Sequence, residues 1–245
     1  MDQGIYTAAA GAIAIEERLA MISNNLANIN TAGFKKDAVV FEDFQRALDT
    51  ARLAPGQYRT VPVDVVVGRQ YIDTAQGAFQ ETGSPLDAAI VGEGFFVVAT
   101  DSGMRYTRAG SFLISPEGLL VTSQGHAVQG QGGDITVGTG KVSIDSRGTV
   151  MVDGNVVDVL QIALIENEAL VREGNALFSV RQGYAPEVMD APEIRQGYIE
   201  TANVDPVVEM VGLITTQRAY EAFQKMIRSV DETYTQSMHN VGMTA

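Results

Sequence analysis

The chain has 245 residues, enough to bury a sizeable core in one large domain or two small ones. With 45% hydrophobic and 19% charged residues, its composition is that of a globular protein and excludes wholesale disorder. The net charge of −13 and the lack of any basic stripe argue against nucleic acid or an anionic membrane as a partner, since both are bound through clustered Lys and Arg.

Residues 1–30 have the hydrophobic pattern of a helix that pairs with another helix. With Ile5 at heptad position a, every a and d position is apolar over four heptads, and this 3.5-residue period is typical of a coiled coil. Residues 8–14 also carry small or apolar side chains on other faces, and a helix of this kind is usually buried. We therefore predict an assembly seam made of Ile5, Ala12, Ile15, Leu19, Ile22, Leu26 and Ile29.

The same segment does not read as a secretory signal or a membrane anchor. It has no basic stretch at its start, and Glu16, Glu17 and Arg18 interrupt its apolar residues. No apolar run reaches the length of about 18 residues that a transmembrane helix needs. We expect no cleaved signal peptide and no membrane insertion, so export would have to use another route.

Asparagines gather where this helix is predicted to end. Asn is a mediocre helix former because its side chain competes for nearby backbone groups. Asn24, Asn25 and Asn28 lie off the heptad seam, and their amides can donate and accept hydrogen bonds in a buried contact. We predict that they are contacts between subunits, with simple fraying of the helix end as the alternative. Gly33 is the predicted left-handed residue that turns the chain away from the helix.

The middle of the chain is predicted to be β-structure. Residues 31–74, with a short helical patch at 42–48, and residues 196–204 read as a connector. Over residues 75–195, Gly-containing turns separate β-rich runs at a spacing of roughly ten residues, which indicates the antiparallel hairpins of a sandwich or open barrel.

The C-terminal segment returns to a helical pattern. Asp205 and Pro206 read as an N-cap followed by Pro at the first helical position, and the helix is predicted to run to about residue 238. A helix of this length has few partners inside the chain other than the N-terminal one. We favour packing between molecules over a closed intramolecular core. The seam on this side comprises Leu213, Tyr220, Phe223, Ile227, Val230 and Tyr234.

The predicted fold class is therefore α+β. It combines a discontinuous N- and C-terminal helical coiled-coil domain (residues 1–30 and 205–245), a connector (31–74 and 196–204) and a mainly antiparallel β-rich outer domain (75–195).

The sequence offers little for catalysis or for holding a cofactor or metal. The absence of cysteine excludes disulfides, Cys-ligated zinc and thiol catalysis. His126 and His239 belong to no closely spaced ligand pair, and the GxG of residues 92–94 lacks the third glycine of a dinucleotide-binding loop. A glycosidase-type carboxylate pair among Glu81, Asp87 and Glu93 is the remaining enzymatic alternative. We predict no catalytic, cofactor-binding or metal-binding residues and no enzymatic activity.

Segments in order along nearly the whole chain resemble the bacterial flagellar basal-body rod and hook family. They are SNNLANINTAGFKK (23–36), SPLDAAIVGEGFFVV (84–98), RYTRAGSFLISPEGLLVTSQGHAVQG (105–130) and GYIETANVDPVVEMVGLITTQRAYEAFQKMI (197–227). Within the family, the opening MDQGIYTAAAGA and the short chain are more similar to proximal-rod members than to distal-rod members.

The resemblance implies a structural subunit that polymerises helically through its terminal helices to form part of the axial drive shaft. It further implies export through the flagellar type III apparatus into the periplasm, and partners that are other copies of the chain and other rod proteins. A different class, an oligomeric periplasmic glycan-binding module, is the main alternative, with an enzyme acting on peptidoglycan behind it. The absence of Trp and the aromatic content of 7% weaken the glycan-binding alternative, since sugars are bound by aromatic stacking.

Overall fold

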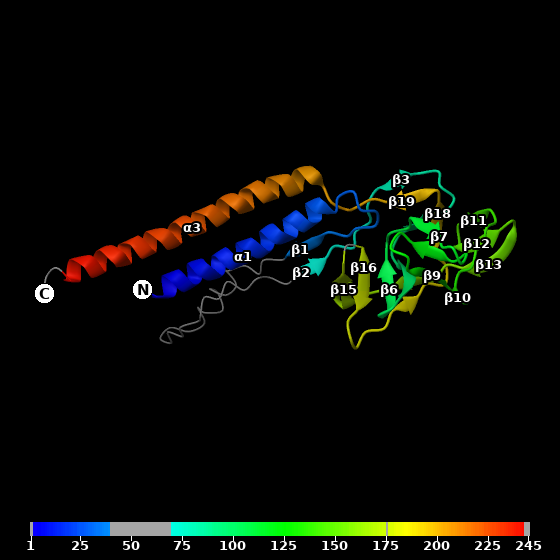
Figure 1. The fold of residues 1–245 in the computed structure, drawn as a ribbon, viewed down its shortest axis with the longest axis horizontal. Coiled ribbons are helices and arrows are strands. Elements are labelled where there is room, and N and C mark those ends of the chain that lie inside the picture. The colour runs from blue at the N-terminus through cyan, green and yellow to red at the C-terminus, as the bar shows by residue number, and fades with distance from the viewer. Residues whose placement is uncertain (1, 40–69, 175, 243–245) are drawn as a thin grey trace, which may run out of the picture. The chain divides into compact units, whose positions relative to one another are not determined.

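The computed structural model describes residues 2–39, 70–174 and 176–242 (Figure 1). The helical patch predicted at 42–48 lies outside these residues. The elements in chain order are α1 (Asp2–Ala27), β1 (Asp37–Val39), β2 (Gln70–Ile72), β3 (Phe79–Glu81), β4 (Ala88–Val91), β5 (Phe95–Thr100), β6 (Gly103–Thr107), β7 (Phe112–Ile114), β8 (Leu120–Thr122), β9 (Ala127–Gly130), β10 (Gly133–Asp134), β11 (Val142–Ile144), β12 (Thr149–Val152), β13 (Asn155–Val159), β14 (Ile162–Leu164), the 3₁₀ helix η1 (Asn167–Ala169), β15 (Leu170–Glu173), β16 (Leu177–Val180), β17 (Glu187–Val188), β18 (Glu193–Gln196), β19 (Tyr198–Glu200) and α3 (Pro206–Gly242).

The chain divides into two compact units. The first, called the helical unit below, contains residues 1–26, 37–71 and 206–245. The second, the β unit, contains residues 27–36 and 72–205. The domain bounds given above from the sequence stay a prediction.

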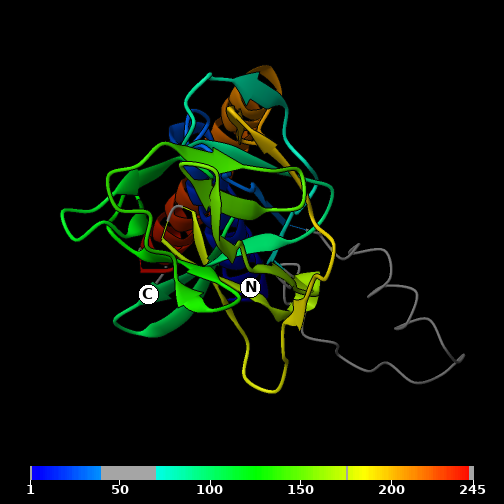
Figure 2. The ribbon, with the colours of Figure 1, turned by 90° about the vertical axis from the view of Figure 1, so that its right-hand side faces the viewer.

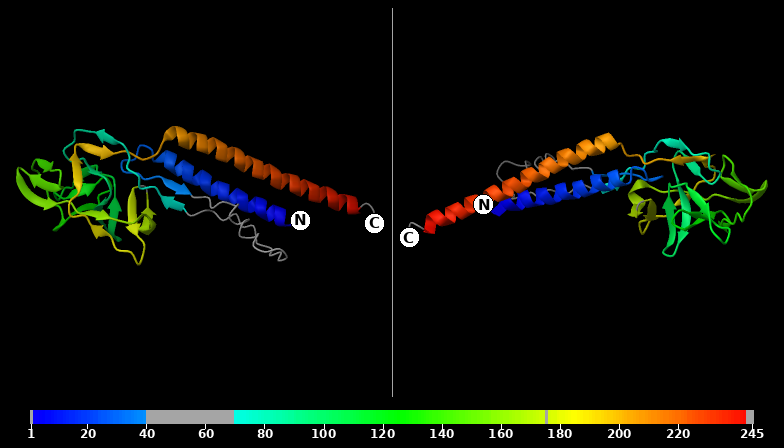
Figure 3. Two further views of the ribbon diagram at one scale, coloured as in Figure 1. Left: turned by 180° about the vertical axis from the view of Figure 1, so that it is seen from behind. Right: turned by 45° about the horizontal axis from the view of Figure 1, so that its top comes forward.

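In the helical unit, α1 and α3 lie side by side and run in opposite directions (Figures 1 and 3). A Cβ atom added to Gly11 would lie 2.7 Å from Cε1 of Phe223, and one added to Gly212 would lie 3.5 Å from Cδ1 of Ile22. Gly11 therefore leaves room for the ring of Phe223, whereas a Cβ at Gly212 would make an ordinary contact with Ile22. The two neighbouring pairs together fix an antiparallel register.

The predicted fold class is wrong. In place of a discontinuous N- and C-terminal helical coiled-coil domain, the described residues have a single helix near each terminus and a large antiparallel β-rich region between them. A coiled coil buries its a and d side chains in holes of the facing helix. In α1, Ile22 is buried, whereas Ala12, Ile15, Leu19 and Leu26 are only half-buried. Burial instead extends to Gly11 and Ala14, which lie off the predicted seam among the small residues of 8–14.

The β unit is built from antiparallel pairs (Figure 2). Its largest sheet has the order β15-β16-β6-β5-β9-β8-β7, with β10 paired to β9, β14 paired to β5, and β17 paired to β14. Smaller sheets are β11-β12-β13, β18-β4 and β19-β3, and β1 pairs with β2 elsewhere in the chain. The hairpin signals in the sequence correspond to real turns: Asp153 and Gly154, between β12 and β13, have φ angles of 51° and 84°, as a tight hairpin turn requires.

Strand β5 lies at the centre of the hydrophobic core. Phe96 and Val98 pack into one buried cluster, and Phe95 and Val97 pack into another. Successive side chains of a strand point to opposite faces, so an uninterrupted apolar run is what a strand buried on both faces needs. Gly94 precedes this run with a φ angle of 110°, and a Cβ there would lie 2.6 Å from Cγ2 of Ile162.

Candidate assembly surface and junction cluster

The first turns of α3 expose a continuous set of apolar side chains. Their exposed fractions are 65% for Val207, 64% for Val208, 47% for Met210, 57% for Val211 and 52% for Ile214. These five residues, called the apolar face below, recur at the three- and four-residue spacing that places side chains on neighbouring sides of a helix. Contiguous exposed apolar surface of this kind marks a site of interaction.

Two of the predicted seam residues, Ile22 of α1 and Phe223 of α3, lie against a glycine of the other helix. In α3, Leu213, Tyr220, Phe223 and Ile227 are half-buried, and Thr216, which is not among the predicted seam residues, is buried. The seam residue Ile29 is half-buried and lies beyond the end of α1. The side chains of Ile5, Val230 and Tyr234 lie outside the described part of the chain. The role of these residues in assembly stays a prediction.

The asparagines near the end of α1 differ from one another. Asn25 is 1% exposed, and its amide makes two hydrogen bonds of 3.0 Å to the backbone of Asp37: Nδ2 donates to the carbonyl, and Oδ1 accepts from the N–H. Asn28 is buried and accepts a hydrogen bond from Oγ1 of Thr31, whereas Asn24 is exposed. Asn25 thus holds the returning chain beside α1. The use of these residues as subunit contacts stays a prediction.

The structure also shows the positions of Asp205, Pro206 and Gly33, for which the sequence predicts a helix start and a turn. α3 begins at Pro206, directly after the exposed Asp205. Gly33 has a φ angle of 68° and sits so close to Ala109 that an added Cβ would lie 2.2 Å from its backbone nitrogen. α1 ends at Ala27, so Gly33 does not cap the helix but turns the segment that follows it.

A buried group of charges, called the junction cluster below, joins three distant segments of the β unit. Lys35, Arg108 and Glu200 have side-chain exposures of 0%, 4% and 1%. Nζ of Lys35 lies 2.5 Å from Oε1 of Glu200, and Nη1 of Arg108 lies 3.0 Å from Oε2 of the same carboxylate. One carboxylate therefore serves two cations.

Backbone groups complete the junction cluster. Nζ of Lys35 also donates to the carbonyl of Ala75 at 2.7 Å, and Nη2 of Arg108 donates to the carbonyl of Gly92 at 2.6 Å. Burial lowers the pKa of the Lys35 ammonium. The neighbouring Glu200 carboxylate raises the same pKa and so opposes this effect in part. Burial likewise lowers the pKa of Arg108.

Further hydrogen bonds tie together the segment that follows α1 and the segment that precedes α3. Asn203 accepts from the N–H of Lys36 at 2.7 Å through Oδ1, and its Nδ2 donates to the carbonyl of Asp73 at 2.8 Å. The guanidinium carbon of Arg172 lies 4.7 Å from the ring centroid of Phe34, which is fully buried. All of these residues belong to the β unit. The two chain segments that lead to the helices are therefore fixed to each other within it.

Sequence reasoning missed the junction cluster. Each of its residues lies inside a segment quoted above for the family resemblance, but a Lys, an Arg and a Glu ordinarily stand on the surface. Nothing in the local pattern indicates burial, because the burial arises from segments far apart in the chain.

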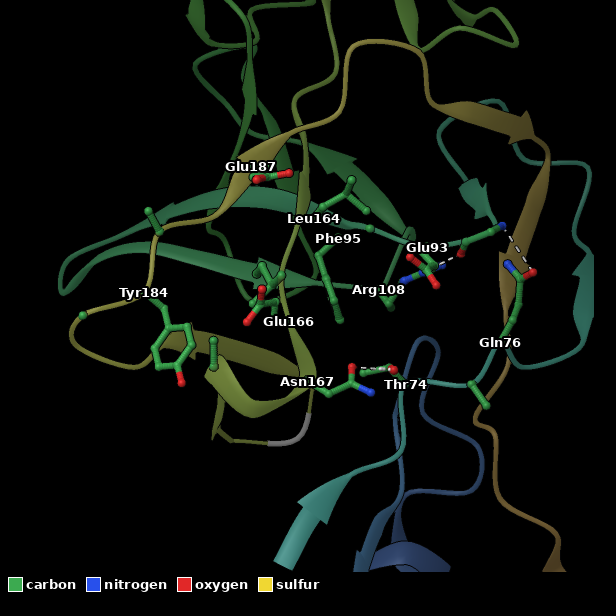
Figure 4. A pocket seen from close by; sticks show the side chains of 17 residues that line it. Thr74, Gln76, Glu93, Phe95, Arg108, Leu164, Glu166, Asn167, Tyr184 and Glu187 are labelled. Atoms are coloured by element: carbon green, nitrogen blue, oxygen red, sulfur yellow. Dashed lines mark hydrogen bonds between the residues drawn. The ribbon is translucent and has the colours of Figure 1, made fainter.

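The β unit also has a cavity of about 790 Å³ (Figure 4). Its lining includes Glu93, Glu166, Glu187 and Tyr184, with Arg108 of the junction cluster at one side.

Within the described residues, no group of His, Cys, Asp or Glu side chains is arranged to hold a metal ion. Of the carboxylates considered above for catalysis, Asp87 accepts a 2.6 Å hydrogen bond from Oγ1 of Thr82.

Three family models match the chain. They are the flagella basal body rod protein model over residues 5–35, the flagellar hook protein FlgE/F/G D1 domain over 89–152, and the flagellar basal body rod FlgEFG protein C-terminal model over 195–238. The flagellar basal-body rod protein FlgF of Caulobacter vibrioides is 35% identical, with 99% of each chain covered. The rod protein FlgG of the same species is 36% identical over 94% of this chain and 96% of its own, and FlgG of Bacillus subtilis is 32% identical over 95% and 96%.

The chain belongs to the flagellar basal-body rod protein family. It is a structural rod subunit and not an enzyme. Membership places it in the flagellar basal body and among proteins that assemble with other rod and flagellar proteins. No helix in the described residues combines the length and the apolar character needed to cross a membrane.

The three matched segments of this rod protein each contribute one member of the junction cluster. Lys35 closes the first, Arg108 lies in the second, and Glu200 lies in the third. The segments that carry the family resemblance therefore meet at one buried point of the β unit.

Proposed function

We propose that this rod protein is a proximal-rod subunit of the FlgF type that polymerises helically through α1 and α3. The observation that carries the proposal is the apolar face. Its valines, Met210 and Ile214 remain exposed in the single chain although each would gain by leaving water. Contacts between unlike surfaces that do not close into a ring give an open helical assembly, which is the form of a rod.

The FlgF assignment is supported by coverage rather than by identity. The FlgF relative of Caulobacter vibrioides matches over 99% of both chains, against 94% and 96% for the FlgG relative, at nearly equal identity. The distal-rod alternative is not better supported. Complementation decides between them: the gene should restore swimming to a strain lacking its own proximal-rod FlgF protein and not to one lacking FlgG. The reverse result would overturn the assignment.

The assembly role can be tested on the full chain with one buried charge. Val211→Glu places a carboxylate in the apolar face, whereas Gln217→Glu adds the same charge at an exposed position of α3 outside it. Burying an unpaired charge costs several kcal/mol, so association of the first variant should weaken by more than about a hundredfold. Sedimentation velocity should find oligomers for the native chain and for Gln217→Glu, and monomers for Val211→Glu. Equal assembly of both variants would contradict the proposal.

We also propose that the chain reaches the periplasm unfolded, through the flagellar type III export apparatus. Membership of the flagellar basal-body rod protein family supports this route. In cells without that apparatus, the chain should accumulate in the cytoplasm. Its recovery from the periplasm of such cells would refute the route.

A further inference from the structure

The cavity of the β unit plays no part in the function proposed above. Its walls come from the segment before β3, the turn between β4 and β5, Arg108, the end of β14 with η1, and the loop between β16 and β17. All of these segments belong to the β unit. The volume of about 790 Å³ lies within the range of about 300–1,000 Å³ that ligand sites occupy, so a short peptide or a small organic molecule fits.

Carboxylates dominate the charge of the cavity. Its charged lining residues are the three exposed acids Glu93, Glu166 and Glu187 and the buried cation Arg108. None of these acids forms a salt bridge with a Lys or Arg side chain in the described part of the chain. Figure 4 shows Glu166 and Glu187 well apart from Glu93, so the acids do not converge on one point. A ligand that meets them needs several cationic groups held apart.

Arg108 supplies a second feature, independent of the acids. Its side chain is 4% exposed, and its guanidinium carbon lies 5.4 Å from the ring centroid of Phe95, another residue of the cavity wall. Nη1 and Nη2 donate to Glu200 and to the carbonyl of Gly92, whereas Nε is buried without a hydrogen-bond partner among the described residues. A buried donor without an acceptor is costly, and an oxygen atom of a bound ligand removes that cost.

The rest of the wall suits the aliphatic part of a basic side chain. Leu164 and Ile165 are half-buried, and Tyr184 is 42% exposed. The long stems of Lys and Arg pack on apolar surface while their charged ends stay with polar groups, and a cation also binds well over an aromatic ring. The cavity therefore offers one hydrogen-bond donor, apolar wall and three separate negative charges.

We infer that the cavity binds a short basic segment of a polypeptide, with two or more Lys or Arg residues. A backbone carbonyl of the segment accepts from Nε of Arg108, and its basic side chains reach Glu166 and Glu187. This binding is additional to polymerisation and does not rest on it. A polyamine offers the cations without the carbonyl, and an acidic peptide offers the carbonyl without the cations, so neither satisfies both features.

The contribution of the acids can be measured by titrating the full-length protein with trilysine, acetylated and amidated at its ends, in a calorimeter. Replacing two acids of the cavity, by Glu166→Gln with Glu187→Gln, should weaken binding by about fivefold or more. Glu168→Gln with Glu117→Gln is the matched control, because it removes two exposed carboxylates that do not line the cavity. The control should bind as the native chain does. Equal weakening in both variants, or no binding of trilysine to the native chain at millimolar concentration, would overturn the inference.

The carbonyl contact is tested by the NMR signal of the Nε–H group of Arg108. Trilysine should shift this signal. Spermidine, which carries the same charge and no carbonyl, should leave it in place and bind about fivefold more weakly or less tightly still. An unmoved signal with trilysine, or equal binding of the two ligands, would refute a peptide as the occupant. Sedimentation of the same variants should be native, so failure of this inference leaves the proposed rod function standing.

Discussion

Removing the carboxylate of Glu200 should destabilise the β unit more than removing either of its partners. Glu200 is the shared counter-ion of Lys35 and Arg108, all of them almost completely buried. Glu200→Gln keeps the shape and a hydrogen-bond acceptor but leaves two buried cations without a negative charge. Breaking a buried ion pair by removing one partner typically costs about 3–5 kcal/mol, and here two pairs lose the same partner.

Lys35→Met is the matched control. It leaves one cation, Arg108, facing one carboxylate, Glu200, at 3.0 Å, so the two remaining charges balance each other. The variant loses two hydrogen bonds of Nζ, one of them to the carbonyl of Ala75. Unsatisfied buried acceptors cost about 1–3 kcal/mol, which is less than the loss expected for Glu200→Gln.

The assay is equilibrium unfolding of the full chain in urea, followed by the circular dichroism of the β-structure. Both variants should unfold at a lower urea concentration than the native chain, with the slope of the free energy against urea unchanged. The midpoint of Glu200→Gln should be the lower of the two. A loss below about 1 kcal/mol for Glu200→Gln, or a larger loss for Lys35→Met, would refute the reasoning from charge balance.

The other predictions concern single residues. Gly33→Ala should lose more than about 2 kcal/mol in urea unfolding, because an added Cβ would lie 2.2 Å from the backbone of Ala109 at a positive φ; stability equal to native would contradict this. Ile22→Asp should cost several kcal/mol of helix-pair stability and abolish swimming, and normal motility would count against burial of this residue in the working rod. Asn25→Ala should lower the free energy of unfolding by about 1–3 kcal/mol, because it removes two hydrogen bonds to the backbone of Asp37. Asn25→Asp keeps the accepting oxygen and should recover part of this loss if the acceptor matters most. Because the pKa of Lys35 is lower in the folded than in the unfolded chain, its contribution to the free energy of unfolding rises with pH between the lowered folded value and the unfolded value of 10.5. Unfolding measured at increasing pH up to 10.5 should show this rise in the native chain and not in Lys35→Met.

The parts of the fold that depend on local signals were predictable from the sequence. Pro206 marks the start of α3, and Asp153 with Gly154 makes the hairpin turn between β12 and β13. The apolar run at residues 95–98 is the buried strand β5. In each case a backbone restriction or a side-chain period within a few residues decides the structure.

The helical packing and the junction cluster were not predictable in the same way. A heptad pattern identifies apolar positions but does not weigh the size of Gly11 against Phe223, which sets how the helices approach. Asn25 lies off the seam, yet it is buried by a hydrogen-bonded backbone that returns beside it. Lys35 becomes buried only when distant segments meet, because its partner Glu200 lies 165 residues further along the chain.

Electron microscopy of the purified full-length protein, beside a version lacking residues 1–30 and 205–245, tests the central claim most directly. The claim is that the helical ends, and not the β unit, join one rod subunit to the next. Filaments or oligomers should form from the full-length chain and be absent from the shortened one at equal concentration. Assembly of the shortened chain to the same extent would contradict the account.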